Sequence, residues 1–502
     1  MKPVKTILIC LLALVSIGAQ AAAPIRLSEG EARFFLLRTG FAPDQAEVDA
    51  LTGQSARQAV SALIGKAKMA KPFHPAPDFS VQPPPVPYRL LKSREEQQYQ
   101  GLDLKRWWMR EMIDSPTPLQ ERMTLFWHNH FATSQQKVIS AQAMWRQHLL
   151  LRHGALGSFA SLLHGVAKDP AMLVYLDGAN NRKEAPNENF AREVMELFTL
   201  GEATQGGHYS EQDIKQAARA FTGWSVDRTD FSFKYRPAFH DNADKTLFGR
   251  SGNFDGDEAL DILLAQPTAA RFILDKLWKE FVSPEPDKAQ IERMANGFRA
   301  SGYDIGQALS ELFLSDAFWA ESNRGSLVKS PVDLVVGTLR QFDFGYSDAT
   351  PFALKSAQLG QNLLMPPNVK GWPGQNDWIN ASTLLERKRF TEQLFRAAEP
   401  KADPLMMADG MNGQTQTGGS TVGAVGSGGV IKIGQAKSDV TFNAQRWLAR
   451  YGGYPDRVPS DALKTDLANV LLEVPTTQTI AKGTVGLAYV RALTQDPAYQ
   501  LK

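Results

Sequence analysis

The chain has 502 residues, with 55 lysines and arginines against 53 aspartates and glutamates, so its formal net charge at pH 7 is +2. This balance argues against a nucleic-acid partner, because binding to phosphates needs a net basic surface. Hydrophobic residues make up 43% of the sequence and there is one cysteine, so an apolar core and not disulfides must stabilise the fold.

The first 21 residues have the three parts of a signal peptide. Lys2 and Lys5 precede an apolar run over Ile7–Ile17, and residues 19–21 (Ala-Gln-Ala) form a small-x-small cleavage pattern. The run is shorter than the ~20 residues of a membrane-spanning helix, although a retained N-terminal anchor is the alternative. Cys10 lies inside the run, which argues against a lipoprotein. We expect a periplasmic or extracellular protein with no membrane span after signal cleavage.

Apolar residues recur with helical spacing along most of the chain. Helices are predicted over 31–37, 44–63, 97–112, 119–131, 141–151, 188–200, 212–221, 259–264, 269–281, 288–300, 305–314, 331–341, 382–398, 444–451, 461–472 and 484–493. Strand-like runs are few, and 231–235 is the best candidate for a small hairpin. The predicted fold class is therefore all-α, a large multi-helix globular domain with long loops and a minor short hairpin.

Changes in composition divide the chain. A helical core domain is predicted over 24–400, with a proline-rich surface segment over 72–87. Residues 401–441 are rich in Gly, Ser, Thr and Gln, which predicts a flexible insertion because such a segment buries too little surface to offset its ordering entropy. The helices of 442–502 are expected to dock on the core.

The first stretch with candidate chemistry is residues 118–134, which contains His128 and His130. Two histidines two positions apart on a helix point to different sides, so they bind one metal ion only if the backbone is extended or the helix ends there. His128 and His130 are candidate ligands of a divalent metal on that basis. The alternative makes His130 a hydrogen-bonded histidine of the core.

The densest polar cluster covers residues 177–193. Asn187 is expected to cap a helix that carries Glu188, Arg192 and Glu193, with Glu193 at the edge of its buried face. Arg192 lies between Glu188 and Glu196 at i, i+4 spacing, so an ordinary surface ion-pair ladder explains part of the pattern. The crowding of amides, including Asn187 and Asn189, fits a polar ligand or an ion better than a core.

Two later loops complete the candidate site. His240 and Asp241 supply a possible general base with its neighbour, or two metal ligands, and a plain turn is the alternative. Residues 366–380 combine tryptophans, prolines and amides. Trp372, Trp378 and Asn380 could stack on sugar rings and bond hydroxyls, or the loop could instead close the helical core.

Several multi-residue stretches occur in an order that resembles the bacterial domain-of-unknown-function family numbered eighteen hundred. These stretches are residues 127–134, 169–173, 186–193, 196–201, 222–224, 329–331 and 366–372. The likeness runs from about Phe34 to Phe390 and includes the final helix, with the Gly-rich insertion outside it. The resemblance implies an exported helical protein, whose relatives tend to be encoded beside a companion similar to the phosphatase and sulfatase superfamily. It implies no activity and no catalytic residues.

Two functions are compatible with these patterns. The first is an exported hydrolase- or lyase-type enzyme acting on an envelope or extracellular polymer such as polysaccharide. Its catalytic groups would be Glu188, Arg192, Glu193, His240 and Asp241, and its substrate contacts Asn187, Asn189, Trp372, Trp378 and Asn380. This hypothesis predicts that these groups and His128 or His130 line one cavity. The second is a non-catalytic binding or assembly partner of the phosphatase- or sulfatase-like protein.

Overall fold

The structure, a computed structural model, describes residues 26–81, 94–202, 206–227, 229–398 and 427–502. The described chain is mainly α-helical with small antiparallel sheets, which confirms the predicted fold class. The predicted signal peptide, residues 1–21, lies outside the described residues. No helix in the described ranges is long and apolar enough to cross a bilayer.

The helices before the middle of the chain are α1 (Glu29–Thr39), α2 (Gln45–Leu51), α3 (Ala56–Lys68), α4 (Arg94–Asp114), α5 (Pro118–His130), α6 (Gln135–Val138), α7 (Ala141–Gly154), α8 (Phe159–Ala167), α9 (Pro170–Tyr175), α10 (Glu188–Glu193), a π-helix (Val194–Thr199) and α11 (Glu211–Ala220). Those that follow are α12 (Gly256–Leu264), α13 (Pro267–Phe281), α14 (Lys288–Ala300), α15 (Ile305–Phe313), α16 (Asp316–Trp319), α17 (Pro331–Gln341), α18 (Thr350–Gln358), α19 (Ala381–Ala397), α21 (Ala444–Ala449), α22 (Asp461–Leu471) and α23 (Gly486–Gln495).

The strands form three small antiparallel sheets. They are β1 (Trp224–Val226) with β2 (Phe233–Tyr235), β3 (Lys245–Leu247) with β4 (Arg250–Gly252), and β5 (Gly345–Tyr346) with β7 (Ala436–Phe442) and β6 (Ser427–Ile433). The pairing of β1 with β2 confirms the hairpin predicted near 231–235.

The structure describes only the last part of the segment predicted to be flexible, 401–441. Residues 401–426 lie outside the described residues, but β6 and β7 form a hairpin over most of the rest, with Gly429 opposite Val440. Ile431, Ile433, Val440 and Phe442 are buried at alternate positions of the two strands. This period-2 pattern lets the hairpin bury one face against α18 and α19, which outweighs the effect of the surrounding glycines.

Side-chain capping sets several helix boundaries. The single helix predicted over 44–63 is wrong, because the chain leaves α2 at Thr52 and turns at Gly53, whose φ of +82° favours glycine. Ser55 and Gln58 then form a capping box that begins α3. The chain therefore contains two short helices at an angle where periodicity alone indicates one.

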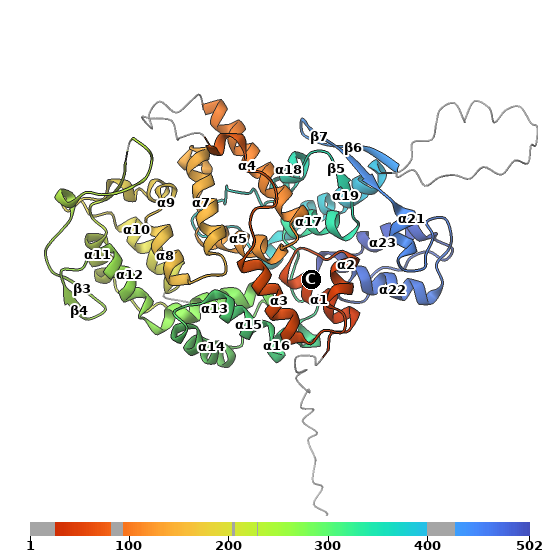
Figure 1. Ribbon diagram of the computed structural model, residues 1–502, viewed down its shortest axis with the longest axis horizontal. Coiled ribbons are helices and arrows are strands. Elements are labelled where there is room, and N and C mark those ends of the chain that lie inside the picture. Colours follow the sequence, from red (N-terminus) through yellow and green to blue (C-terminus); the bar gives the residue numbers. More distant parts are fainter. Residues whose placement is uncertain (1–25, 82–93, 203–205, 228, 399–426) are drawn as a thin grey trace, which may run out of the picture.

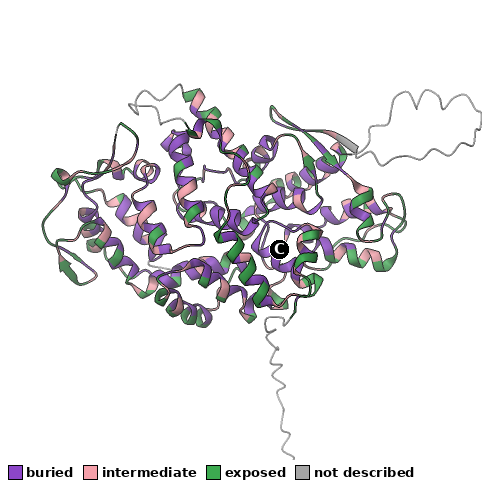
Figure 2. Ribbon diagram, viewed as in Figure 1, coloured by how far each residue is buried: buried purple, intermediate pink, exposed green. Residues whose placement is uncertain are grey.

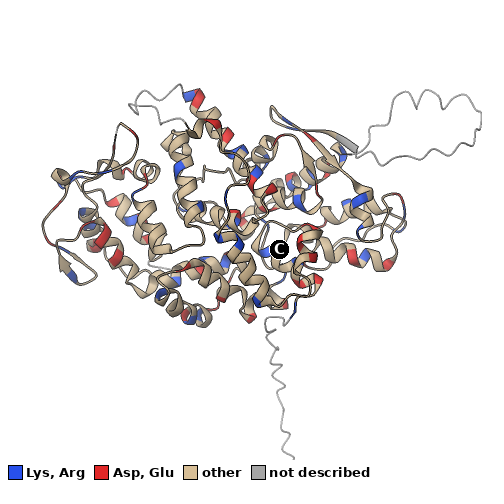
Figure 3. Cartoon of the chain, in the orientation of Figure 1, with Lys and Arg blue, Asp and Glu red and all other residues tan. Residues whose placement is uncertain are grey.

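The buried apolar side chains form one continuous core that runs through the interior of the molecule (Figure 2). Basic and acidic residues are interspersed over the chain (Figure 3), in agreement with its net charge of +2. Along the long axis, α10–α12 and β1–β4 lie at one end and α21–α23 at the other, with α1–α3 between them (Figure 1).

Residues 442–502 pack against the helices of the N-terminal part. Trp447 donates its indole N–H to the carbonyl of Gln341, at 2.9 Å. Leu501 forms a β-bridge with Val328, so the last residues run beside the segment that precedes α17. The final helices thereby bring residues near 450 and 466 close to α1 and α2, and this contact forms the groove described below.

Candidate functional site

His128 lies in a buried aromatic cluster. Its Nε2 atom is 3.2 Å from Nδ1 of His148, and its ring centroid is 4.6 Å from that of Trp108. Burial lowers the pKa of His128 to about 3, so the imidazole is neutral at physiological pH. The second imidazole of the pair, His148, also has its pKa lowered by burial. His128 therefore packs in the core between α4 and α7.

His130 uses both of its ring nitrogens within the fold. Nε2 lies 3.1 Å from the carbonyl oxygen of Phe198 and must donate to it, which leaves Nδ1 to accept from the ammonium group of Lys276 at 3.0 Å. Burial, and secondarily Lys276, holds the pKa of His130 well below its usual value. His128 and His130 thus have different partners, and the described part of the chain contains no group of three His, Cys, Asp or Glu residues that could hold a metal ion.

A π-helix explains why His130 meets Phe198. After α10 the backbone changes to i, i+5 hydrogen bonds, and the N–H of Leu200 donates to the carbonyl of Met195 at 2.8 Å. The carbonyls of Leu197 and Phe198 near its end accept from Lys276 and His130. Two distant segments, α5 and α13, are thereby tied to this end of the π-helix.

The predicted amide cluster holds the start of α10 in place. The side chain of Asn181 accepts from the N–H of Asn187 at 2.8 Å and donates to the carbonyl of Ala218 at 3.1 Å. Asn187 caps α10 by accepting from the N–H of Asn189, and it donates to the carbonyl of Leu176. Both amides therefore have backbone partners; Asn181 is buried, Asn187 is half-buried and Asn189 is exposed.

Arg192 and Glu193 have different environments on α10. Arg192 makes a two-pronged contact with Glu211, at 2.9 and 2.7 Å, and a longer one with Glu196, so the ion-pair ladder extends to α11. Glu193 is half-buried, and burial together with the charge of Glu196 raises its pKa. Glu188 is partly exposed in the first turn of the helix.

The loop predicted to be aromatic approaches this face of α10. Lys370 pairs with Glu202 at 2.7 Å, and its charge offsets part of the rise in the pKa of Glu193. The N–H of Trp372 donates to the side-chain oxygen of Asn129, at 2.6 Å. Asn129, between the two histidines, therefore joins the stretch 127–134 to the stretch 366–372.

The tryptophan rings of this loop are buried and do not form a surface for a ligand. Trp372 and Trp378 are each only 5% exposed, so their rings fill the core, as in the alternative in which the loop closes it. Asn380 forms a capping box with Thr383 at the start of α19. The described geometry places these three side chains in structural roles.

His240 and Asp241 are also held by neighbouring segments. His240 is buried, and its Nδ1 atom lies 2.8 Å from the carbonyl of Thr222. Asp241 accepts from Arg219 at 2.6 Å and from the N–H of Ala243 at 2.9 Å, and the first of these bonds lowers its pKa. These bonds hold the loop of His240 and Asp241 as a turn against α11.

The predicted residues are distributed over several parts of the fold. His240 bonds the carbonyl of Thr222, and the N–H of the next residue, Gly223, donates to the carbonyl of Asn181 beside the start of α10. His130 instead bonds the carbonyl of Phe198 in the π-helix that follows α10. The two histidines therefore bond to opposite ends of this helical segment.

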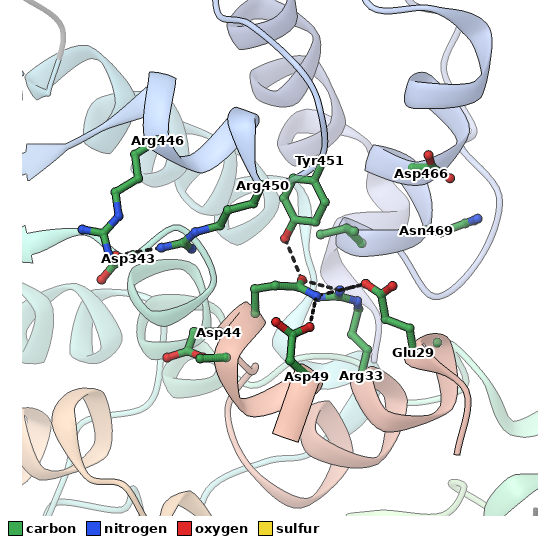
Figure 4. Close-up of a pocket in the computed structure, with 14 residues that line it drawn as sticks. Glu29, Arg33, Asp44, Asp49, Asp343, Arg446, Arg450, Tyr451, Asp466 and Asn469 are labelled. Carbon is green, nitrogen blue, oxygen red and sulfur yellow. Dashed lines mark hydrogen bonds and ion pairs between the residues drawn. The ribbon is translucent and has the colours of Figure 1, made fainter. Parts of the chain in front are cut away.

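A cavity of about 1120 Å³ lies elsewhere, in a groove between α1 and α2 on one side and α21 and α22 on the other. Figure 4 shows the side chains that line it. We call it the polar groove; it is lined by Glu29, Gly30, Arg33, Asp44, Gln45, Ala46, Asp49, Asp343, Arg446, Arg450, Tyr451, Asp466, Asn469 and Val470. One wall is formed by α1 and α2, and the opposite wall by α21, α22 and the turn at Asp343.

Charged and amide side chains bridge parts of the groove. Gln45 joins the two walls: it accepts from Arg33 at 2.8 Å and from the hydroxyl of Tyr451 at 3.1 Å, and it donates to Asp49. On the far wall Arg450 lies 3.3 Å from Asp343. Tyr451 is the one aromatic residue of the lining, and burial raises its pKa.

Sequence reasoning missed both Lys276 and the groove. A lysine on a helix gives no sign that it will face an imidazole 146 residues away. The groove joins residues more than 400 positions apart, such as Gln45 and Tyr451, and no motif marks them. The sequence gives no sign that Asn129 binds the loop of Trp372; its only distinguishing feature is its place between two histidines.

The fold and the groove define a mainly α-helical globular protein with an open, charged groove. The chain belongs to the family described as Protein of unknown function (DUF1800), whose model matches residues 34–501. This match includes the Gly-rich segment and the last helices. The chain matches no curated protein and no solved structure.

Proposed function

We propose that this protein is an exported, non-catalytic binding protein that docks a charged surface of a protein partner in the polar groove. The groove carries this proposal, because its lining mixes acidic, basic and amide side chains and is open to solvent along α2 and α22. Protein interfaces use such polar rims to orient partners. A small-molecule site would be expected to have a more apolar lining.

The partner that best fits the family context is a phosphatase- or sulfatase-like exported protein. Five lining residues are acidic (Glu29, Asp44, Asp49, Asp343 and Asp466) and three are basic (Arg33, Arg446 and Arg450). We expect the docking surface of the partner to carry the complementary pattern, with basic residues facing α1 and α2. Export rests on the signal-peptide pattern of residues 1–21.

A hydrolase- or lyase-type enzyme acting on a polymer such as polysaccharide is the second candidate function. Glu193 is the observation that favours it, since a half-buried carboxyl with a raised pKa is suited to general acid catalysis. His130, His240 and Asp241, however, are bound by partners of the fold, and a diffuse set of groups gives little catalysis. A Glu193→Gln variant that abolishes depolymerisation of a cell-envelope polysaccharide would favour the enzyme.

Titration calorimetry with the purified phosphatase- or sulfatase-like protein of the same organism tests the binding proposal. Arg450→Glu reverses the charge of an exposed groove residue, and we expect binding at least about tenfold weaker. Arg271→Glu is the matched control, because Arg271 is an exposed arginine paired with Glu292 on α14, outside the groove. Equal effects of the two substitutions, or no binding by the wild-type chain, would overturn the proposal.

A further inference from the structure

The guanidinium group of Arg387, on α19, is fully buried and only partly bonded. Nη1 donates to the carbonyl of Lys329 at 2.9 Å and to the side-chain oxygen of Gln500 at 3.2 Å. Nε and Nη2 have no partner within the described residues, and neither does the side-chain amide nitrogen of Gln500. A buried cationic donor left unsatisfied is strongly destabilising, so these atoms require a partner.

The two free nitrogens of Arg387 lie on the same edge of the guanidinium plane. Their N–H bonds are parallel, which is the geometry that arginine uses to grip an oxyanion through two hydrogen bonds or a halide between two donors. Since Nη1 is already bonded, the N–H of Nε and one N–H of Nη2 form a free pair of donors along one edge.

The surroundings are rich in buried positive charge. Lys329 is 5% exposed, and its ammonium lies 4.0 Å from the ring centroid of Tyr499. Lys502 and Arg122 are also buried, and both pair with the buried carboxylate of Asp333. A second buried carboxylate, Glu473, acts on Lys329 but pairs with Arg324. Because both carboxylates are engaged by other cations, they offset the charge of Arg387 only in part.

We propose that a small inorganic anion binds at the Nε–Nη2 edge of Arg387, with the side-chain amide of Gln500 as a further donor. Such an anion would compensate the buried cations and fasten the segment 498–502 to α19 and to the residues before α17. Desolvation lowers the pKa of Arg387 to about 10, which agrees with a guanidinium that lacks a full counter-charge. The site is independent of the polar groove.

Diffraction from crystals of the full chain grown in sodium bromide tests the site directly. We expect a bromide anomalous peak within hydrogen-bond distance of Nε and Nη2 of Arg387. The absence of a peak there, with ordered solvent bonding these atoms instead, would overturn the proposal.

Thermal unfolding supplies a second measurement. Replacing gluconate by bromide at constant ionic strength should raise the Tm of the wild-type chain by about 2–4 °C, and an Arg387→Met variant should lose this rise. Arg340→Met is the control, because Arg340 is bonded to the carbonyls of Ala42 and Ile113 and to Glu47. An equal rise in Arg387→Met and the wild type would refute anion binding at this edge; if Arg387→Met does not fold, the bromide crystals decide.

Discussion

The ammonium group of Lys276 lies 3.0 Å from Nδ1 of His130, and together the two side chains join α5, α13 and the π-helix. Burial lowers the pKa of Lys276 to about 7 and holds His130 neutral. The hydrogen bonds to the carbonyls of Leu197 and Phe198 then satisfy groups that the end of a helix leaves free. His130, which the sequence suggests as a metal ligand, therefore connects three helical segments inside the core.

A double-mutant cycle tests the interaction between His130 and Lys276. His130→Leu removes the partner of both Lys276 and the Phe198 carbonyl, so we expect the free energy of unfolding to fall by about 2–4 kcal/mol. Lys276→Met should cost less, about 1–2 kcal/mol, because its methylenes are replaced. In urea unfolding, the double variant should be more stable than the sum of the single effects predicts. Strict additivity would show that the contact does not couple the two residues.

The stability of the protein should depend on pH through His128. Its folded pKa is about 3, against 6.5 for an unperturbed histidine, so below pH 6.5 the unfolded chain takes up a proton that the folded chain does not. The sign is therefore a loss of stability as pH falls, of about 2 kcal/mol between pH 6.5 and 5 from this residue. His128→Phe should lose less stability than the wild type over this interval.

The control for this pH effect is the exposed His153. A His153→Gln variant should follow the wild-type profile in urea unfolding at pH 6.5 and pH 5. If His128→Phe and the wild type lose equal stability on acidification, the acid sensitivity arises from other groups.

Gly371 should be essential for the close packing of the Trp372 loop against Asn129. Its φ is +90°, and a Cβ atom there would meet the side-chain and backbone oxygens of Asn129, at 2.3 and 2.5 Å. Gly371→Ala should therefore destabilise the protein by at least about 2 kcal/mol and shift tryptophan fluorescence toward that of exposed indole. Gly374→Ala is the matched control, since a Cβ at Gly374 meets nothing within 4 Å. Equal stabilities of the two variants would contradict this role.

Metal removal should leave the protein unchanged. The imidazoles of His128 and His130 have partners in the fold, and the described residues offer no three-ligand group. We expect dialysis against EDTA to change the Tm by less than about 1 °C, because no metal contributes folding energy. Stoichiometric metal in the purified chain that disappears in His128→Ala would contradict this expectation.

Much of the local structure could be predicted from the sequence. Helical spacing of apolar residues located most of the helices, and the capping residues Ser28 and Ser330 stand where α1 and α17 begin. The errors occurred where local geometry overrides periodicity. Gly53 divides one predicted helix into two, and a glycine-rich stretch still forms the β6–β7 hairpin because its alternating apolar side chains reach the core.

The candidate site was harder to predict, because polarity in a sequence does not reveal its partner. In the sequence Asn187 and Asp241 are suited to a ligand. In the fold Asn187 caps α10, and Asp241 accepts from Arg219. The sequence leaves open whether Trp372 and Trp378 are exposed or buried, and in the fold both are buried. Each of these outcomes depends on contacts between segments distant in the chain.

Helix propensity, capping and apolar spacing act over a few residues, so they already indicate the helical character and the positions of most helices, and the ordered stretches indicate the family. The contacts of His130 with Lys276 and of Gln45 with Tyr451 across the groove appear only once the chain is folded. Hydrogen bonds and ion pairs are short-ranged, and the burial of a shared core is what brings their distant residues together.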